Sequence, residues 1–599
     1  MEERLRDSLP VLHEVKDKAI LAGVVQSDLQ SDCSEYKDLQ SDKRITNADT
    51  QSERIANPLE RIPNHILIEG DNLEALTALS YTHEGKIDVI YIDPPYNTGN
   101  KDFVYNDSFV DSEDSYRHSK WLSFMNKRLK IAKKLLSDKG VIFISIDDNE
   151  QAQLKLLSDS IFGSGNFIAQ VIWERAFAPV NLKKHFSESH DYIICYAKQI
   201  EYAVCNGLNR SDDANDRYSN PDDDPRGVWT SSDMTVGPVV PDKLYDIIAP
   251  NGTIMRPASG RCWLYTKERY EEMRKDNRLW FGKKGNNMPR VKKFLSEVKQ
   301  GITPMTIWKY SEVGHSQDAA KEVKDIFGGE SRFTYPKSMR LIKRCIGLYS
   351  QDSSIILDFF AGSGTTLHAT MQLNSEDGGH RQCILVTNNE NNICEEVTYE
   401  RNKRVINGYT TPKGVEVAGL KANTLRYYKT DYISRDRTQK NMRNLVTAAT
   451  DLLCIKEDLY EEQKTFGRFK LKPHLARYFN DGRKHMLIIY REELIDEIVE
   501  EIKSLTPDPS PKERGVGRIK IYVFSPGRYP FTDNFREVED KVELVALPAA
   551  IYDAYQKVLP KRKEKLFEEE KEQVETKVPA DLFFAERSDL EVEREGQGV

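Results

Sequence analysis

The chain has 599 residues, of which 39% are hydrophobic and 30% charged, a length and composition typical of a globular protein with roughly three or four domains. A formal net charge of −8 excludes a surface that is basic throughout, so any nucleic-acid site must be a local basic patch. No apolar run approaches the roughly 18 residues that span a bilayer, the first residues carry no signal-peptide core, and eight scattered cysteines argue against a zinc site. We therefore expect a cytoplasmic protein without a membrane segment or a metal centre.

Residues 1–60 are polar and predict an N-terminal arm. From about residue 61, short apolar strands alternate with helical patterns, as in HILIEGDNLEAL, then IDVIYIDPP, then a helix followed by GVIFISID. Strand and helix continue to alternate up to about residue 200. Residues 61–200 therefore predict the first half of an α/β domain, a Rossmann-like, mostly parallel sheet with helices on both faces.

Residues 201–310 interrupt this alternation and predict an inserted domain. Within it, residues 256–309 hold fourteen Lys and Arg against five Asp and Glu, inside a chain that is acidic overall. The α/β pattern returns over 311–425, which predicts the second half of the sheet domain. Residues 426–599 predict a C-terminal α+β region with a turn-rich linker near 504–517 and a charged tail.

A glycine-rich turn follows the apolar strand IILD near residue 355, and the sequence FFAGSGTT then opens a helical pattern. Glycines let the backbone approach a ligand closely, and a helix N-terminus offers unpaired N–H groups. The turn lacks the third spaced glycine of a dinucleotide fingerprint and the lysine of a P-loop. Alone it fits a plain structural turn as well as a cofactor loop.

The sequence Asp93-Pro94-Pro95-Tyr96 ends the second predicted strand. Its two prolines fix the backbone and remove two N–H donors, so the Asp93 carboxylate and the Pro94 carbonyl form a turn that holds acceptors. An exocyclic amino group of a base needs such acceptors, and Tyr96 offers a flat face for stacking. An isolated Asp-Pro-Pro would instead be a proline-terminated strand with a surface aspartate.

Together these motifs resemble a known family. Asp93-Pro94-Pro95-Tyr96 resembles the catalytic motif of DNA amino-methyltransferases, and Phe360-Ala361-Gly362-Ser363-Gly364 resembles their cofactor motif. Their order, with the catalytic motif first, is similar to the β-group. The strings LIEGDN, DPPYNTG, FTYPKS and VTNNENNIC resemble the modification (Mod) subunit of type III restriction-modification systems, over about 64–200 and 310–410.

The resemblance implies S-adenosylmethionine as cofactor and adenine N6 in double-stranded DNA as the methylated position. It assigns catalysis to Asp93, Pro94, Pro95 and Tyr96, and the base pocket to Asp71 and Asn97. It assigns cofactor binding to residues of the glycine loop and its flanks: Asp358, Phe360, Ala361, Gly362, Gly364, Thr365, Lys337 and Glu390. Lys337 would line the methionine end, and Glu390 or Asn388 would bind the ribose.

The basic interval lies where the family keeps its target-recognition domain. Its Lys and Arg residues are expected to contact phosphates and base edges, together with its aromatic residues. These aromatics are Trp263, Tyr265, Tyr270, Trp280 and Phe281. The target adenine would be flipped out of the duplex onto Tyr96. The resemblance also implies a homodimer and a helicase-nuclease restriction subunit as partners.

Three other functions remain open at this point. Methylation of cytosine N4 uses the same kind of pocket, and only the aspartate at position 93, where a serine would favour cytosine, indicates adenine. The chain could instead recognise DNA without catalysis, although Asp93, Tyr96 and the glycine loop are all present. Methylation of a protein or RNA amide is disfavoured by the long basic insert.

Overall fold

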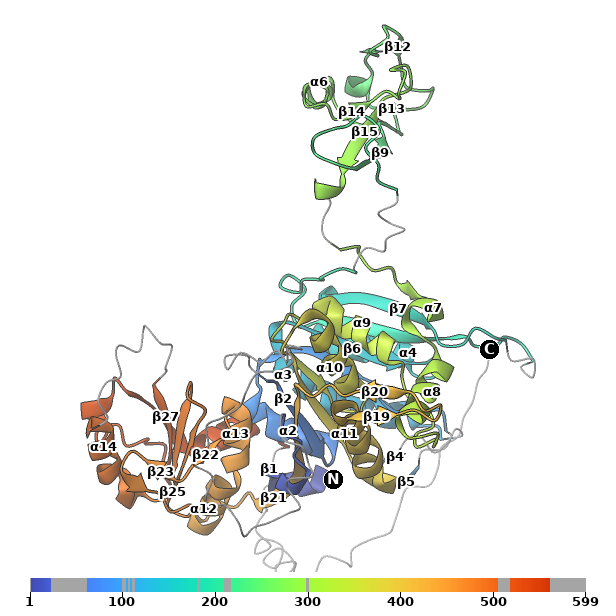
Figure 1. Cartoon of the computed structure of the whole chain (residues 1–599). Helices are drawn as coiled ribbons and strands as arrows, with labels where there is room; N and C mark the ends of the chain where they lie inside the picture. Colours follow the sequence, from blue (N-terminus) through green and yellow to red (C-terminus); the bar gives the residue numbers. More distant parts are fainter. Residues whose placement is uncertain are drawn as a thin grey trace, which may run out of the picture.

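The computed structural model describes residues 2–22, 62–99, 104–105, 108–109, 114–179, 184–208, 217–297, 301–504 and 518–560. Figure 1 shows a central α/β body, with the unit of residues 217–297 at the top of the view and a C-terminal unit at the left. Within the described residues, no helix is both long and apolar enough to cross a membrane.

A mixed ten-stranded sheet forms the centre of the body. In spatial order its strands are β1 (Ser8–Glu14), β21 (Thr424–Ser434), β2 (Asn64–Glu69), β18 (Gln382–Thr387), β17 (Ile355–Asp358), β3 (Ile87–Ile92), β6 (Leu136–Ile146), β8 (His190–Ala197), β7 (Phe167–Glu174) and β16 (Ile307–Trp308). Pairing is parallel from β21 through β6, whereas β1 and β8 run antiparallel to their neighbours. The predicted α/β class with a mostly parallel sheet is confirmed.

The two halves of the predicted domain interleave in this sheet. Strands β17 and β18, from the later segment, lie between β2 and β3 of the earlier one. Leu357 pairs with Ile90 on one side, and Val386 pairs with Ile68 on the other. The strand before the glycine loop therefore lies directly beside the strand before Asp93.

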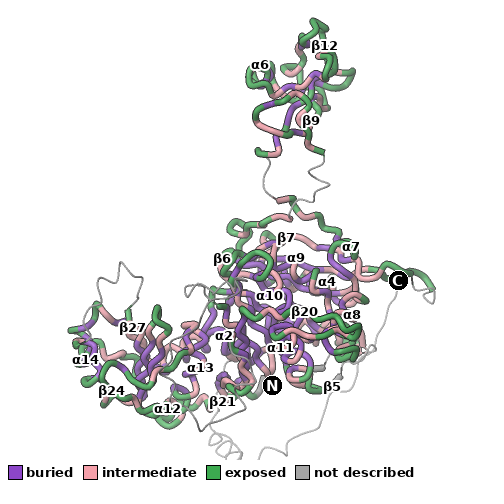
Figure 2. Tube along the Cα trace, viewed as in Figure 1, coloured by how far each residue is buried: buried purple, intermediate pink, exposed green. Residues whose placement is uncertain are grey.

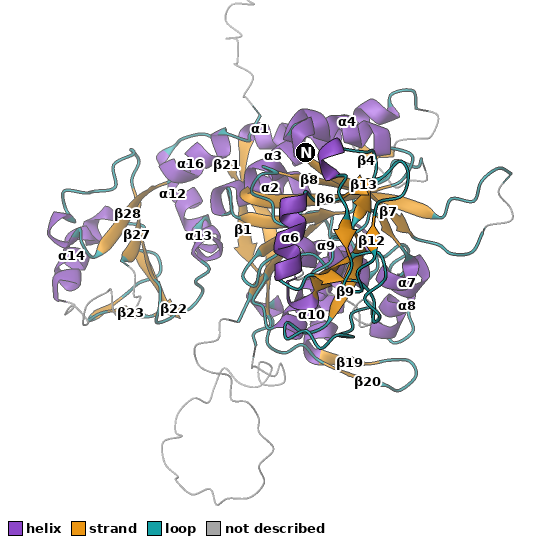
Figure 3. Cartoon of the chain, turned by 90° about the horizontal axis from the view of Figure 1, so that it is seen from above, coloured by secondary structure: helices purple, strands orange, loops and turns teal. Residues whose placement is uncertain are grey.

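Helices cover both faces of the sheet, because alternate strand residues point to opposite sides. On one face, Ile90 and Ile142 pack with α2 (Asn72–Thr82), α3 (Arg117–Leu135) and α4 (Gln151–Phe162). On the other, Val89 and Val141 pack with α8 (Ser316–Ile326), α9 (Met339–Tyr349), α10 (Thr365–Asp377) and α11 (Glu400–Asn407). Figure 2 shows the resulting buried interior, and Figure 3 shows α3 and α4 on one side of the strands and α9 and α10 on the other.

The first residues differ from the expected polar arm. Residues 2–14 form α1 (Glu2–Asp7) and β1, and β1 pairs antiparallel with β21. Leu9, Val11 and Leu12 are buried, so this short apolar stretch completes an edge of the sheet. The sheet also continues to residue 434, beyond the expected boundary at 425, and residues 23–61 of the arm lie outside the described residues.

Residues 217–297 form a unit with its own core. Its main sheet joins β9 (Trp229–Asp233), β15 (Arg290–Phe294) and β14 (Leu279–Trp280), next to α6 (Lys267–Lys275). Trp263, Tyr270 and Phe281, which we expected to contact DNA, are buried in this core. That part of the prediction is wrong, because so small a unit needs its aromatics to build a hydrophobic centre.

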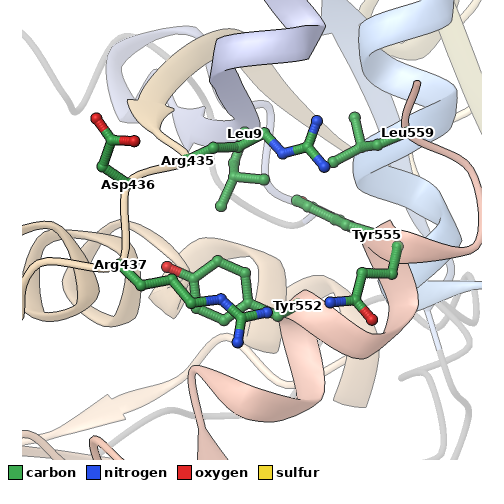
Figure 4. A pocket seen from close by; sticks show the side chains of 8 residues that line it. Leu9, Arg435, Asp436, Arg437, Tyr552, Tyr555 and Leu559 are labelled. Atoms are coloured by element: carbon green, nitrogen blue, oxygen red, sulfur yellow. The ribbon is translucent and has the colours of Figure 1, made fainter. Parts of the chain in front are cut away.

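The C-terminal unit holds a five-stranded sheet in the order β22 (Glu462–Gln463), β25 (Ala476–Asn480), β26 (His485–Ile489), β27 (Ile519–Phe524) and β28 (Val542–Leu547). It packs on the body through α16 (Ala549–Gln556), where Tyr555 Oη donates to the Pro10 carbonyl at 2.7 Å. A pocket of about 350 Å³ lies at this junction. Figure 4 shows Leu9 of β1 and Tyr555 of α16 among the side chains that line it. Most of the expected linker and the charged tail lie outside the described residues.

Candidate active site

The two sequence motifs meet at the carboxyl edge of the sheet. β17 and β3 are parallel neighbours, so the loops that follow Asp358 and Ile92 leave the sheet side by side. The charge of Asp93 contributes to raising the pKa of Asp358, in agreement with this proximity. In an open α/β sheet this edge is where ligands bind.

One carboxylate oxygen of Asp93 is hydrogen-bonded, and the other has no hydrogen-bond partner among the described residues. Its Oδ2 accepts a hydrogen bond from Lys337 Nζ at 2.8 Å, and the two side chains are 25% and 12% exposed. Its Oδ1 is buried, and no group among the described residues donates to it. Buried polar atoms are nearly always hydrogen-bonded, so an open buried acceptor marks a position where a ligand can donate.

Lys337 lies against the Asp93-Pro94-Pro95-Tyr96 turn. Besides bonding Asp93, its ammonium lies 4.9 Å from the centre of the Tyr96 ring. Its assignment to the methionine end of the cofactor stays a prediction.

Tyr96 lies beside this ion pair. Its Oη is buried without a hydrogen-bond partner among the described residues. Burial, and after it the charge of Asp93, raises the pKa of Tyr96 well above its usual range. The hydroxyl is therefore neutral and the ring remains an apolar surface with an ammonium near it.

Polar side chains from α3 and from Glu150 form hydrogen bonds around residues 95–97. Trp121 Nε1, on α3, donates to the Pro95 carbonyl at 2.7 Å. Asn97, in a left-handed conformation with φ 58°, donates from Nδ2 to Glu150 Oε1 at 2.5 Å. His118 Nδ1 lies 2.7 Å from the same oxygen, and burial raises the pKa of Glu150. The Nδ2 of Asn97 is thus engaged, whereas its Oδ1 is buried without a hydrogen-bond partner among the described residues, and its assignment to the base pocket stays a prediction.

Asp71 caps a helix at the end of β2. Its Oδ1 accepts from the Leu73 N–H at 2.8 Å, and Arg128 Nη2 lies 3.5 Å from Oδ2. The neighbouring Asn72 donates to the Phe359 carbonyl at 3.1 Å, which connects this turn to the glycine loop. The base-pocket role expected of Asp71 remains a prediction.

Asp358 fixes the start of the glycine loop. Its Oδ1 accepts from the Phe360 N–H at 2.9 Å and its Oδ2 from Thr366 Oγ1 at 2.5 Å. Burial raises the pKa of Asp358 to about 7, against the effect of both hydrogen bonds. Ala361 is buried beside it and donates its N–H to the Val386 carbonyl at 3.1 Å.

Two glycines of the loop have backbone conformations that other residues rarely adopt. Gly362 has φ 50° and Gly364 has φ 73°. A Cβ at Gly364 would lie 2.4 Å from Asn402 Nδ2, and one at Gly362 would lie 3.3 Å from the Phe333 ring. Other side chains therefore pack closely against the loop, and α10 begins immediately after it at Thr365.

The structure reveals three residues around the loop that the sequence did not indicate. Thr398 Oγ1 donates to the Gly362 carbonyl at 2.6 Å, and Asn402 Nδ2 lies 3.3 Å from the Gly364 carbonyl. Fully buried Arg401 donates to the hydroxyls of the two residues that flank Gly364, at 3.2 and 2.6 Å. Thr398 lies in a π-helical turn, Ile393–Tyr399, which no simple periodicity predicts, and Arg401 and Asn402 follow that turn on α11.

Glu390, the expected ribose partner, is exposed to solvent. Glu390 begins a short 3-10 turn after β18 and is exposed, as is Asn388. Both follow the strand next to β17, so they lie at the carboxyl edge of the sheet. Their role stays a prediction. The described residues also hold no cluster of three or more His, Cys, Asp or Glu that could bind a metal ion.

Comparison with known proteins gives the class of this site. Residues 87–401, more than half of the chain, match the N6/N4 family model described as DNA methylase. The chain belongs to this DNA methylase family. The match includes both the Asp93 motif and the glycine loop.

Particular relatives are type III and type II enzymes. The chain is 37% identical over 348 residues to the Mod subunit of the type III restriction-modification enzyme StyLTI of Salmonella typhimurium, covering 54% of this chain and 52% of that protein. It is 36% identical over 375 residues to the type II methyltransferase M.KpnI of Klebsiella pneumoniae, covering 59% of this chain and 87% of that one. The chain thus spans about half the length of the StyLTI subunit.

Among solved structures, a putative DNA modification methylase of Thermus thermophilus in complex with S-adenosyl-L-methionine aligns with a TM-score of 0.29 at 14% identity. The alignment covers 61% of this chain and 99% of that one.

Proposed function

We propose that the chain transfers a methyl group from S-adenosylmethionine to N6 of an adenine in DNA. The observation that carries this proposal is the buried, open Oδ1 of Asp93 beside the ring of Tyr96. Membership of the DNA methylase family supports the reaction class. The relatives named as type III Mod subunits support a role in DNA modification.

The residues around the glycine loop fit the proposed cofactor. The turn leaves the first N–H groups of α10 available, and half-buried Phe333 and Phe360 provide apolar faces for an adenosine. Residues that would hold it are those of the loop and its flanks: Asp358, Phe360, Ala361, Gly362, Gly364, Thr365, Lys337 and Glu390. When bound, the cofactor supplies an electrophilic methyl group on a sulfonium sulfur.

Asp93 and Pro94 would prepare the amino group of the base. Asp93 Oδ1 and the Pro94 carbonyl would each accept one N–H of N6, while Tyr96 stacks on the flipped ring. Both hydrogen bonds localise the nitrogen lone pair, which then forms the N–C bond as the C–S bond breaks. The nitrogen gives up one proton, for which Asp93 Oδ1 is the adjacent acceptor. Such positioning and preorganised charge supply most of the rate in comparable enzymes.

The unit of residues 217–297 would bind the DNA. Many of its cations are neutralised internally: Arg226 by Asp224, Arg278 by Glu297, and Arg290 by Asp233. Exposed Lys283 and Lys284 have no carboxylate within ion-pair distance among the described residues and are our candidates for phosphate contacts. The type III resemblance adds a restriction subunit and a second copy of the chain as proposed partners.

The test is transfer of a labelled methyl group to DNA by the full-length protein. We expect transfer by the wild type and a loss of roughly 10²- to 10³-fold in Asp93→Ala, as when a preorganised polar group is removed elsewhere. Asp138→Ala, at an exposed aspartate on the opposite edge of the sheet, is the control and should be unchanged. Equal rates in Asp93→Ala and wild type would overturn the proposal.

A further inference from the structure

Arg401, on α11, connects the glycine loop to α8 and α10. Its Nη1 donates to Ser363 Oγ at 3.2 Å and to Thr365 Oγ1 at 2.6 Å. Its Nη2 lies 3.3 Å from His368 Nδ1 and 3.5 Å from Glu322 Oε2. The Arg401 side chain is fully buried, so all these contacts are made inside the protein.

The two hydroxyls that Arg401 contacts are also inside the protein. Ser363 and Thr365 are 4% and 3% exposed, and their hydroxyl oxygens lie 3.0 Å apart. Both are therefore engaged with each other and with the guanidinium. A part of Thr365 in binding the cofactor would then fall to its backbone.

The loop needs such contacts because it is rich in glycine. Gly362 and Gly364 allow the turn, but glycine also leaves a chain with the most conformational freedom when nothing holds it. A guanidinium presents several N–H groups in one rigid plane, so Arg401 can bond to two loop residues at once. A loop fixed in this way loses less entropy when a ligand binds.

Stability alone does not account for an arginine at this position. A buried charge must be paired and hydrogen-bonded, and a well-packed hydrophobic side chain of similar volume is often as stable. Glu322 is the carboxylate nearest to the guanidinium. Burial, and after it the charge of Arg401, lowers the pKa of His368 to about 3, so its neutral ring can accept from Nη2.

We propose that Arg401 is a positioning residue for the cofactor, which holds the glycine loop in its binding conformation through the hydroxyls of Ser363 and Thr365. The loop is then ordered before the ligand arrives. This inference rests on the proposed function, since the ligand concerned is S-adenosylmethionine.

The alternative is a purely structural role, because Arg401 also joins three helices. A structural role predicts that Arg401→Met lowers Tm, while the folded protein binds the cofactor as the wild type does. A positioning role predicts a weaker affinity of the folded protein. It also predicts a raised KM for the cofactor with kcat at saturation close to that of the wild type, because Asp93 is held by Lys337 and not by Arg401.

The experiment is calorimetric titration of the full-length protein with S-adenosylmethionine, well below Tm, together with kcat and KM. Arg401→Met should weaken binding about 10- to 100-fold, as when groups that orient the ligands of a metal site are removed. Arg401→Lys keeps the charge without the planar fork and should lie between Arg401→Met and the wild type. Arg404→Met is the matched control on the same helix and should bind as the wild type, because Arg404 contacts Glu400 and the Ile326 carbonyl instead of the loop.

A double-mutant cycle tests whether Arg401 acts through the loop. Thr365→Val keeps the shape of the side chain and removes the hydroxyl to which Arg401 donates. We expect Thr365→Val to weaken binding less than Arg401→Met does. The double variant should bind as Arg401→Met does, because both changes remove the same contact.

The outcomes separate this inference from the proposed function. Wild-type affinity in folded Arg401→Met would overturn the inference and leave the proposed function standing, and so would a double variant in which the two losses multiply. No binding of S-adenosylmethionine by the wild type would instead overturn the proposed function. If Arg401→Met fails to fold, Thr365→Val decides: weakened binding supports the inference, and unchanged binding counts against it.

Discussion

Tyr96 combines a half-buried ring with a buried hydroxyl. Its Oη has no hydrogen-bond partner among the described residues, so its removal leaves no group unsatisfied. We expect Tyr96→Phe to keep stability and turnover. Tyr96→Ala should weaken capture of the base by about 1–3 kcal/mol, the usual value of stacking on an aromatic ring. Binding of DNA that carries an unpaired target base measures this, and equal affinity in both variants would contradict the stacking role.

Asp358, at the start of the glycine loop, affects the pH dependence of stability. Burial raises its pKa from 3.8 to about 7, so the folded protein binds a proton there that the unfolded chain releases. Its contribution to stability is therefore present below about pH 4 and falls as the pH rises to about 7, by at most about 1.4 kcal/mol per pH unit. Asp358→Asn removes this dependence. The difference in Tm, variant minus wild type, should increase from about pH 4.5 to about pH 7.5, and a constant difference would contradict the prediction.

Among the elements, helix α10 has a glycine in the left-handed conformation at each end. Other side chains pack against only one of these two glycines. Gly364 precedes the helix with φ 73°, and Gly378 follows it with φ 76°. Alanine at either position has a conformational cost of about 1–2 kcal/mol. Only at Gly364 would the new Cβ also meet a side chain, Asn402 at 2.4 Å, whereas nothing lies within 4 Å at Gly378.

We therefore expect Gly364→Ala to abolish cofactor binding, because the loop must move to relieve the contact. Gly378→Ala should bind S-adenosylmethionine as the wild type does, and should lose only the conformational cost of about 1–2 kcal/mol in stability. Calorimetric titration with the cofactor measures the difference. Equal affinity in the two variants would show that the loop is not part of the cofactor site.

The elements also show what sequence patterns reveal and what they miss. Apolar strands followed by Asp93-Pro94 or by glycines are local signals, so both motif-bearing strands could be predicted. The insertion of β17 between β18 and β3 could not be predicted from local patterns, since strand order depends on long-range pairing. Arg401 could not be predicted, because an arginine in a charged stretch is usually solvated, whereas here it is buried on α11, which follows a π-helical turn.

For the whole molecule, shifts in composition predicted a division into domains, but they did not predict which residues of the insert lie on its surface. Counting cations over 256–309 overstated the basic surface, because Lys292 is buried between Asp222 and Asp224. Aromatic residues in a small unit serve its core first. The part of the insert that can contact DNA is therefore smaller than the composition indicates.

This view of the insert predicts a specific loss of DNA affinity. Lys283→Glu with Lys284→Glu should weaken binding, and should reduce the slope of log affinity against log salt by about 1 per lost phosphate contact. Lys470→Glu with Lys472→Glu, in the C-terminal unit, makes the same change of net charge and is the control. Fluorescence anisotropy across a salt series measures both pairs. Equal weakening in the two double variants would indicate a general effect of charge rather than a contact by the insert.

The central claim is that Asp93 prepares the amino group of adenine for methylation. Its most direct test is mass analysis of the nucleosides from DNA treated with the full-length protein and isotope-labelled S-adenosylmethionine. The account predicts label in N6-methyl-2′-deoxyadenosine alone, and its disappearance with Asp93→Ala. Label in N4-methyl-2′-deoxycytidine, or none in either nucleoside, would contradict it.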